Sequence, residues 1–176
     1  MTYVILVIIV ILVLVRIFNN GIIVDPPPNP PPFSPAEERL QQEAAGMIRS
    51  CYNEKTQAFD WNTYFSERDG YLYCGYPSVT QQMKWEMDTI GHKQAVMIAG
   101  ILDKGAVTGD FDEARRQLKA AYDTLLNLEV MCGGGNREDC PIRYKKLRKA
   151  AWDFLFNRAP YTKAALLKVT DEFFKG

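Results

Sequence analysis

Four cysteines are the residues of this 176-residue chain whose type and spacing most clearly suggest chemistry: Cys51, Cys74, Cys132 and Cys140. An even number favours two disulfides and an oxidising compartment. We expect sequential pairing, Cys51 with Cys74 and Cys132 with Cys140, because the glycines at 133–135 can bend the second loop until its ends meet. Reduced thiols and a zinc site are the alternatives. Zinc is the weaker of the two, since no C-x-x-C pair is present and the single histidine lies far away in sequence.

Two carboxylates, Glu67 and Asp69, lie among aromatic residues, and glycoside hydrolysis requires two placed carboxylates. Two acids in a turn are more often simply solvated. His92 has no acid or nucleophile at a diagnostic spacing, so we expect it to be structural or exposed. The sequence therefore predicts no catalytic residue, no cofactor site and no metal site, and it favours a protein that is not an enzyme.

The chain begins with twelve aliphatic residues, Val4 to Val15. A helix over Tyr3 to Phe18 would be roughly 24 Å long, against about 30 Å for a bilayer core, so residues 1–18 are predicted to be a single transmembrane anchor that contacts the lipid bilayer. A cleaved signal peptide is the main alternative, but no basic residue precedes the run and no small-x-small site follows it. A buried β-strand is the second alternative to a transmembrane anchor.

Residues 19–33 are predicted to be a proline-rich linker, because Asp25 to Pro32 contains six prolines and cannot be helical. A proline-recognition motif for an SH3-like groove is possible in principle, although no basic residue flanks it. Residues 34–176 are long enough for one domain with its own core. The whole chain is 47% hydrophobic and 24% charged, and both values are ordinary for globular proteins.

Helical periodicity within 34–176 predicts an all-α domain of about five helices. Ser34 with Glu37 predicts the first start, Ser78 with Gln81 begins a second helix that runs to about Lys104, and Asp110 with Glu113 begins a third. A fourth helix is expected from Ile142 to about Asn157 and a last one after Thr162. Gly109, Phe111, Ala114 and Ala121 resemble the second half of a tetratricopeptide repeat, which implies only a style of helix-pair packing.

The segment from Asn53 to Tyr76 is rich in aromatic residues and has no sustained helical period. Arg68-Asp69-Gly70 predicts a turn, with a loop or short hairpin that runs to Cys74 and is tied down by the first disulfide. This aromatic segment either caps the helical core or offers a partner surface made of Tyr71, Tyr73 and Tyr76.

Charge is distributed unevenly although the formal net charge is zero. Residues 34–140 contain 17 acidic and 11 basic side chains, whereas residues 141–176 contain 3 acidic and 9 basic ones. The fourth helix carries a basic run that we predict to bind an acidic partner: Arg143, Lys145, Lys146, Arg148 and Lys149. A solvated face, complementarity within the chain and lipid headgroups are the alternatives. Nucleic acid is not expected, because the basic excess lies on two short helices of a neutral protein.

Two functions of different classes are consistent with these features. We favour a non-enzymatic structural or interaction subunit of a membrane assembly, such as a virion envelope or entry complex, a secretion apparatus or a respiratory-type complex. The alternative is a membrane-tethered glycan hydrolase that uses Glu67 and Asp69. Arg16 alone would keep the domain on the cytoplasmic side, but the cysteines indicate an oxidising side, and we follow the cysteines.

Overall fold

The computed structural model describes residues 32–132, 138, 140–156 and 161–176. The predicted anchor at 1–18 and nearly all of the linker at 19–33 lie outside these residues. Residues 34–176 form one compact unit. Among the helices that the structure describes, none combines the length and the apolar character needed to cross a membrane.

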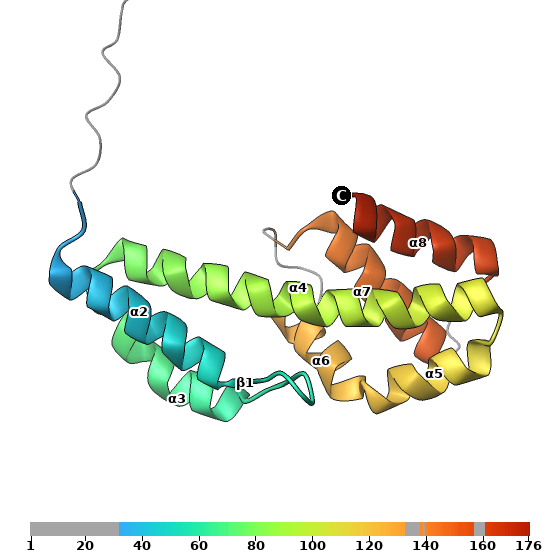
Figure 1. The fold of residues 1–176 in the computed structure, drawn as a ribbon, viewed down its shortest axis with the longest axis horizontal. Helices are drawn as coiled ribbons and strands as arrows, with labels where there is room; N and C mark the ends of the chain where they lie inside the picture. Colours follow the sequence, from blue (N-terminus) through green and yellow to red (C-terminus); the bar gives the residue numbers. More distant parts are fainter. Residues whose placement is uncertain (1–31, 133–137, 139, 157–160) are drawn as a thin grey trace, which may run out of the picture. The chain divides into compact units, whose positions relative to one another are not determined.

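The described part of residues 34–176 is mostly helical, with one two-stranded hairpin, so the predicted all-α class is confirmed (Figure 1). Its elements follow in chain order: α2 (Pro35–Ser50), β1 (Tyr52–Asn53), β2 (Ala58–Phe59), α3 (Trp61–Leu72), α4 (Pro77–Thr108), α5 (Phe111–Ala120), α6 (Tyr122–Met131), α7 (Ile142–Leu155) and α8 (Lys163–Lys175).

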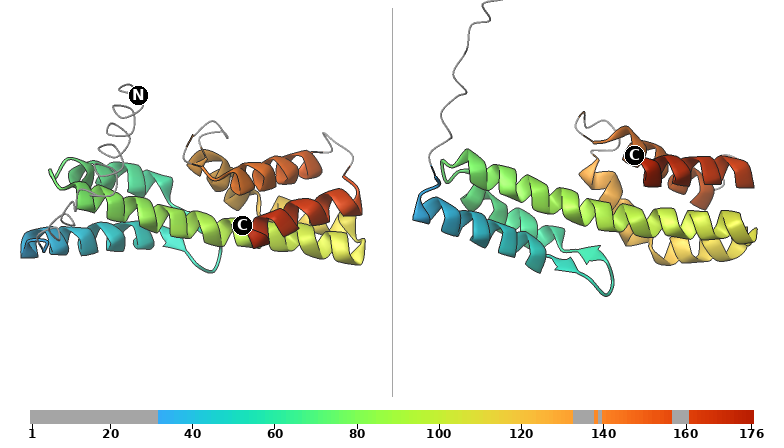
Figure 2. Two further views of the ribbon diagram at one scale, coloured as in Figure 1. Left: turned by 90° about the horizontal axis from the view of Figure 1, so that it is seen from above. Right: turned by 45° about the horizontal axis from the view of Figure 1, so that its top comes forward.

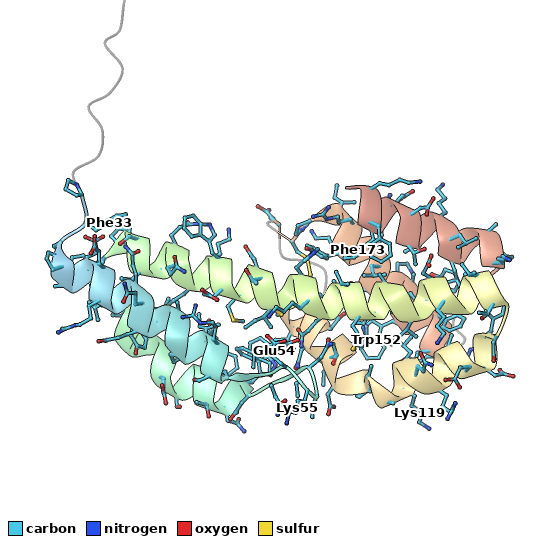
Figure 3. The ribbon with its side chains drawn as sticks, in the orientation of Figure 1. Phe33, Glu54, Lys55, Lys119, Trp152 and Phe173 are labelled. Atoms are coloured by element: carbon cyan, nitrogen blue, oxygen red, sulfur yellow. A yellow bond between two sulfur atoms is a disulfide. The ribbon has the colours of Figure 1, made fainter. Side chains whose placement is uncertain are left out.

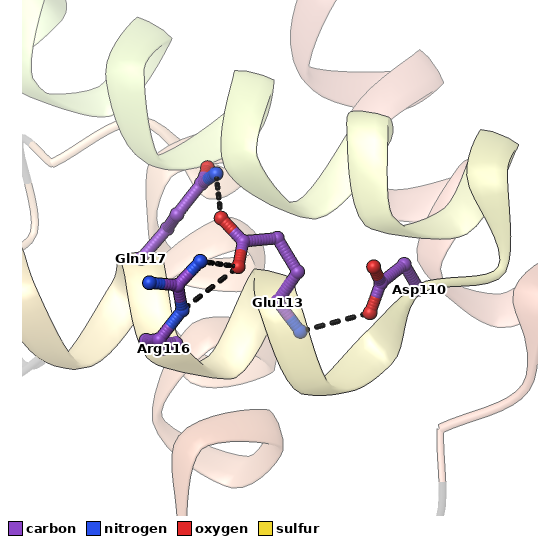
Figure 4. Close-up of polar contacts among 4 residues, drawn as sticks. All are labelled: Asp110, Glu113, Arg116 and Gln117. Carbon is purple, nitrogen blue, oxygen red and sulfur yellow. Dashed lines mark hydrogen bonds and ion pairs between the residues drawn. The ribbon is translucent and has the colours of Figure 1, made fainter.

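Three predicted helix starts are confirmed by hydrogen bonds from backbone amides to capping side chains. Ser34 Oγ accepts from the amide of Glu37 at 3.2 Å, and Thr162 Oγ1 accepts from that of Ala165 at 3.2 Å. Asp110 Oδ1 accepts from the amide of Glu113 at 3.0 Å (Figure 4). Such a cap satisfies a backbone donor that the helix cannot, and it typically stabilises by about 1 kcal/mol.

Helix α4 connects two buried clusters, one along each half of its length (Figures 1 and 2). Its first half packs through Met83 and Ile90 against α2, the hairpin and α3. Its second half packs through Ile98 and Leu102 against α5, α6, α7 and α8. A helix of 32 residues is about 48 Å long, so one element can belong to both clusters.

The aromatic segment differs from its prediction. Strands β1 and β2 form a hairpin in which Tyr52 pairs with Phe59, and α3 then covers the residues at which a turn was expected. Asp60 caps α3 by accepting from the amides of Asn62 and Thr63, both at 3.1 Å. The predicted turn at residues 68–70 is therefore wrong, because a helix capped by Asp60 covers these residues instead.

Two further boundaries are corrected. Ser78 does not cap α4; its hydroxyl donates a hydrogen bond to the carboxylate of Glu37, and α4 begins after Tyr76 without a side-chain cap. The predicted third helix is divided at Ala121, whose φ of −93° and ψ of 20° separate α5 from α6. Leu118 and Leu125 are still both buried in the same cluster, so the apolar stripe continues across the break.

The predicted disulfide between Cys132 and Cys140 is present, with its two Cα atoms 5.3 Å apart. Cys51 and Cys74 are free thiols, so the predicted bridge between them is wrong. Cys51 directly follows α2, whereas Cys74 lies beyond the far end of α3. A helix of 12 residues spans about 18 Å, and a disulfide requires Cα atoms within about 7 Å.

These free thiols are expected to react at different rates with N-ethylmaleimide in the native protein. Cys51 is only 4% exposed, and burial, followed by the charges of Asp60 and Glu67, raises the pKa of its thiol. Cys74 is partly exposed and should be alkylated at least about tenfold faster, because labelling of a buried thiol waits for local opening. Quantitative mass spectrometry of timed samples measures both rates. A Cys51–Cys74 peptide in a non-reducing digest would contradict this assignment.

Candidate functional site

A groove of about 630 Å³ lies where one face of α3, one face of α4 and the junction of α6 with α7 meet. These residues line it: Trp61, Tyr64, Phe65, Arg68, Leu72, Thr80, Met83, Lys84, Met87, Asp88, Gly91, Leu128, Val130, Met131, Cys132, Cys140, Pro141, Arg143 and Tyr144. Most of these side chains are apolar or aromatic. Concave, mostly apolar surfaces of this size are typical of binding sites.

The α3 wall of the groove consists of side chains spaced three and four residues apart. The rings of Trp61 and Phe65 are stacked with centroids 5.6 Å apart, and Tyr64 meets both of them edge-on or tilted. The guanidinium carbon of Arg68 lies 4.6 Å from the centroid of Phe65. Phe65 is nonetheless 48% exposed, so this wall presents an aromatic surface to solvent.

The α4 wall runs from Thr80 through Met83 and Met87 to Gly91. A Cβ atom at Gly91 would lie 3.0 Å from the terminal methyl carbon of Met131, so the absence of a side chain leaves room for that methionine. Methionine side chains are flexible and polarisable, and they adapt to differently shaped apolar partners. This wall therefore suits an apolar occupant without demanding one particular shape.

Buried hydrogen bonds hold the α3 wall against the α6 end of the groove. Trp61 Nε1 donates to Asn127 Oδ1 at 2.6 Å, and Asn127 is 6% exposed. At the hairpin tip the carbonyl of Gln57 accepts from Gln94 Nε2 at 2.8 Å and from Thr124 Oγ1 at 3.4 Å. These bonds connect residues 37 to 67 positions apart, so the groove has a defined width at this end.

Charge in the described part of the lining is mainly positive: it contains Arg68, Lys84 and Arg143 against the acid Asp88, and Arg68 is also paired with Asp69. The guanidinium of Arg143 lies 5.4 Å from the ring centroid of Tyr144 and 6.0 Å from that of Phe173. Arg143 forms no ion pair with any residue that the structure describes. The groove is therefore lined by a cation that lies beside two aromatic rings.

Most of the predicted basic surface on α7 is neutralised within the chain. Lys146 pairs with Glu172 at 2.6 Å, and Arg148 pairs with Glu129. Lys149 pairs with Asp153 at 2.6 Å, a hydrogen bond that raises the pKa of Lys149. Lys145 has no ion pair in the described part of the chain and does not line the groove. Two of these pairs thus join α7 to α8 and to α6, and the third lies within α7.

The predicted tyrosine surface is not brought together as one site. Tyr71 and Tyr76 are partly buried against the cluster formed by α2, α3 and α4. Tyr73 is 83% exposed, and none of the three tyrosines lines the groove. Only Tyr73 of this set therefore offers a ring to a partner.

The two carboxylates considered for hydrolysis do not converge. Glu67 and Asp69 are both exposed and lie two residues apart on α3, which places them about 200° apart around the helix. Asp69 is paired with Arg68 at 3.2 Å. Two carboxylates on opposite sides of one helix cannot flank the same glycosidic bond.

His92 is engaged in an aromatic cluster rather than in a catalytic arrangement. Its Nδ1 lies 2.9 Å from the hydroxyl oxygen of Tyr144, and its ring is stacked on Phe173 with centroids 6.1 Å apart. Phe173 is labelled in Figure 3. Across the described ranges no group of three or more His, Cys, Asp or Glu side chains could hold a metal ion.

Arg143 was predicted to bind a partner and lines the groove, whereas the groove residues on α3 were not predicted, because the aromatic segment was not assigned a helix. Their spacing is nonetheless visible in the sequence, where Trp61, Phe65, Arg68 and Leu72 recur at intervals of three and four residues.

Comparison of the chain with protein families, with curated proteins and with solved structures finds no match.

Proposed function

We propose that this protein is a non-enzymatic interaction subunit of a membrane assembly, held at the bilayer by residues 1–18, and that the groove between α3 and α4 is the place where a partner protein docks. The observation that carries the proposal is the apolar and aromatic lining of this groove, with Phe65 and Val130 each about half exposed. Apolar side chains left open to water in a concave surface favour an occupant that buries them.

The chemistry of the lining supports binding rather than turnover. Both cysteines among the described groove residues are joined in a disulfide, so neither is a free thiol. Asp88 is the only carboxylate in the described part of the lining, so two-carboxylate glycan hydrolysis has no second acid there. What the groove offers is apolar area, ring faces and cations, which are the elements of a protein interface.

Site-specific photo-crosslinking in the cells that produce the protein tests the docking site. A benzoylphenylalanine at position 65 is expected to capture a partner chain, because this ring faces the groove and is 48% exposed. The matched control places the same residue at Phe174, which is 55% exposed on α8 and does not line the groove. Equal capture from both positions, or capture only from position 174, would exclude the groove as the docking site.

The membrane part of the proposal has its own test. Alkaline carbonate is expected to leave the full-length protein in the membrane pellet, because twelve consecutive aliphatic residues remain in lipid whatever the pH. Deletion of residues 1–18 should release it, since the two described clusters are built by residues after Ser34. Release of the full-length chain would contradict the anchor.

A further inference from the structure

We infer that the occupant of the groove is an acidic amphipathic helix of a partner protein. This inference rests on the proposed function and specifies the chemistry of the partner. Three features of the groove support it: the length of its two walls, the methionines of the α4 wall and the charged residues of the lining.

The groove is elongated along two helices. On α3 its lining extends from Trp61 to Leu72, and on α4 from Thr80 to Gly91. Each wall thus covers 11 residue steps, about 16 Å, or three turns of helix. A trough between two helix faces matches the face of a third helix, whose apolar residues recur at i, i+3 or i+4, and i+7.

The α4 wall accepts apolar side chains of varied shape. Met83 and Met87 lie along one wall, and Met131 lies near Gly91 at the end. Methionine-rich grooves bind amphipathic helices because their side chains repack around different ligands. The opposite wall offers the ring faces of Trp61 and Phe65.

The charged residues of the lining favour a partner of negative charge. In the described part of the lining Arg68, Lys84 and Arg143 are cations and Asp88 is an acid, and Arg68 is also paired with Asp69. Arg143 lies beside the rings of Tyr144 and Phe173 and forms no ion pair in the described part of the chain. Opposite charges across an interface speed association and exclude wrong partners, so this lining favours acidic residues beside the apolar stripe.

A display library of 14-residue helical peptides tests this inference. Each peptide carries apolar residues at a fixed three-four stripe and either Glu or Lys at every other position. The target is the full-length chain in nanodiscs of zwitterionic lipid, with empty nanodiscs as the background. We expect Glu-bearing peptides to be enriched, because all library members carry the same apolar stripe and differ only in the sign of the charge that they bring to the groove.

Two charge reversals on α7 identify the groove as the site. Arg143→Glu is expected to weaken the selected acidic peptides by about three- to tenfold and to shift the enrichment toward Lys. Lys145→Glu is the matched control; it makes the same charge change two residues away on another side of the same helix, outside the groove, and should change affinity by less than about twofold. Thermal melting of each variant reports on folding separately.

Several outcomes would overturn the inference. They are enrichment without charge preference, no enrichment, equal loss in both variants, or displacement of the peptides by nanodiscs of anionic lipid, which would identify lipid headgroups as the ligand. Failure of the proposed function is distinguishable. A partner captured at position 65 whose contact segment is basic or extended would disprove the acidic helix and leave the docking site intact.

Discussion

Replacement of Gly105 by alanine is expected to lower the free energy of unfolding by about 1–3 kcal/mol, although alanine is the better helix former by about 1 kcal/mol. A Cβ atom at position 105 would lie 2.5 Å from the Cβ atom of Ala114, a distance that no real contact of this kind shows. Helices α4 and α5 would have to move apart. Only Gly109 and Asp110 connect them, and Gly109 has a φ of 78°, so the connection leaves little freedom to adjust.

Gly100→Ala is the matched control for this prediction. It makes the same change in the same helix, at a position where nothing lies within 4 Å of the added atom, and should raise stability by about 0.5–1 kcal/mol. Urea unfolding of the full-length chain followed by circular dichroism measures both. Ala114→Gly combined with Gly105→Ala should recover part of the loss, because it removes the other half of the clash. Equal effects at positions 100 and 105 would mean that α4 and α5 are not in close contact.

Loss of the disulfide is the second large effect. Replacing both Cys132 and Cys140 by alanine is expected to destabilise the domain by about 2–3 kcal/mol, because the bond closes a loop with a sequence separation of 8 and restricts the unfolded chain. Both cysteines also line the groove, so peptide binding at that end should weaken. Urea unfolding measures stability, and the peptide selection measures binding.

Cys74→Ala serves as the control for the cysteine replacements. This residue is a free, partly exposed thiol, and its loss should cost less than about 1 kcal/mol. Addition of a reducing agent should reproduce the effect of the double replacement in the unaltered protein and leave the double variant unchanged. A reducing agent that does not alter the stability of the unaltered protein would show that the bond is not formed in solution.

The groove could not be derived from the sequence alone, because its walls come from separate segments. Trp61 and Asn127 are 66 residues apart, and their hydrogen bond exists only because α3 and α6 are both packed against α4. Likewise, the basic run on α7 was predicted to bind an acidic partner, but Glu172 and Glu129 are brought to it by α8 and α6. No local pattern indicates which distant acid will face a given lysine.

The sequence by itself determined the features that depend on a few neighbouring residues. Ser34, Asp110 and Thr162 begin helices because each reaches an amide only three positions further along, and Cys132 meets Cys140 across a short loop. The tertiary structure alone decided the state of Cys51 and Cys74. Trp61, Tyr64 and Leu72 pack the aromatic segment against the cluster that α2 and α4 share, as helix α3. Cys51 lies beside the start of this helix and Cys74 beyond its end, about 18 Å away. A capping hydrogen bond depends on residues within about one helical turn of each other, whereas a disulfide or ion pair between distant segments depends on how whole helices pack.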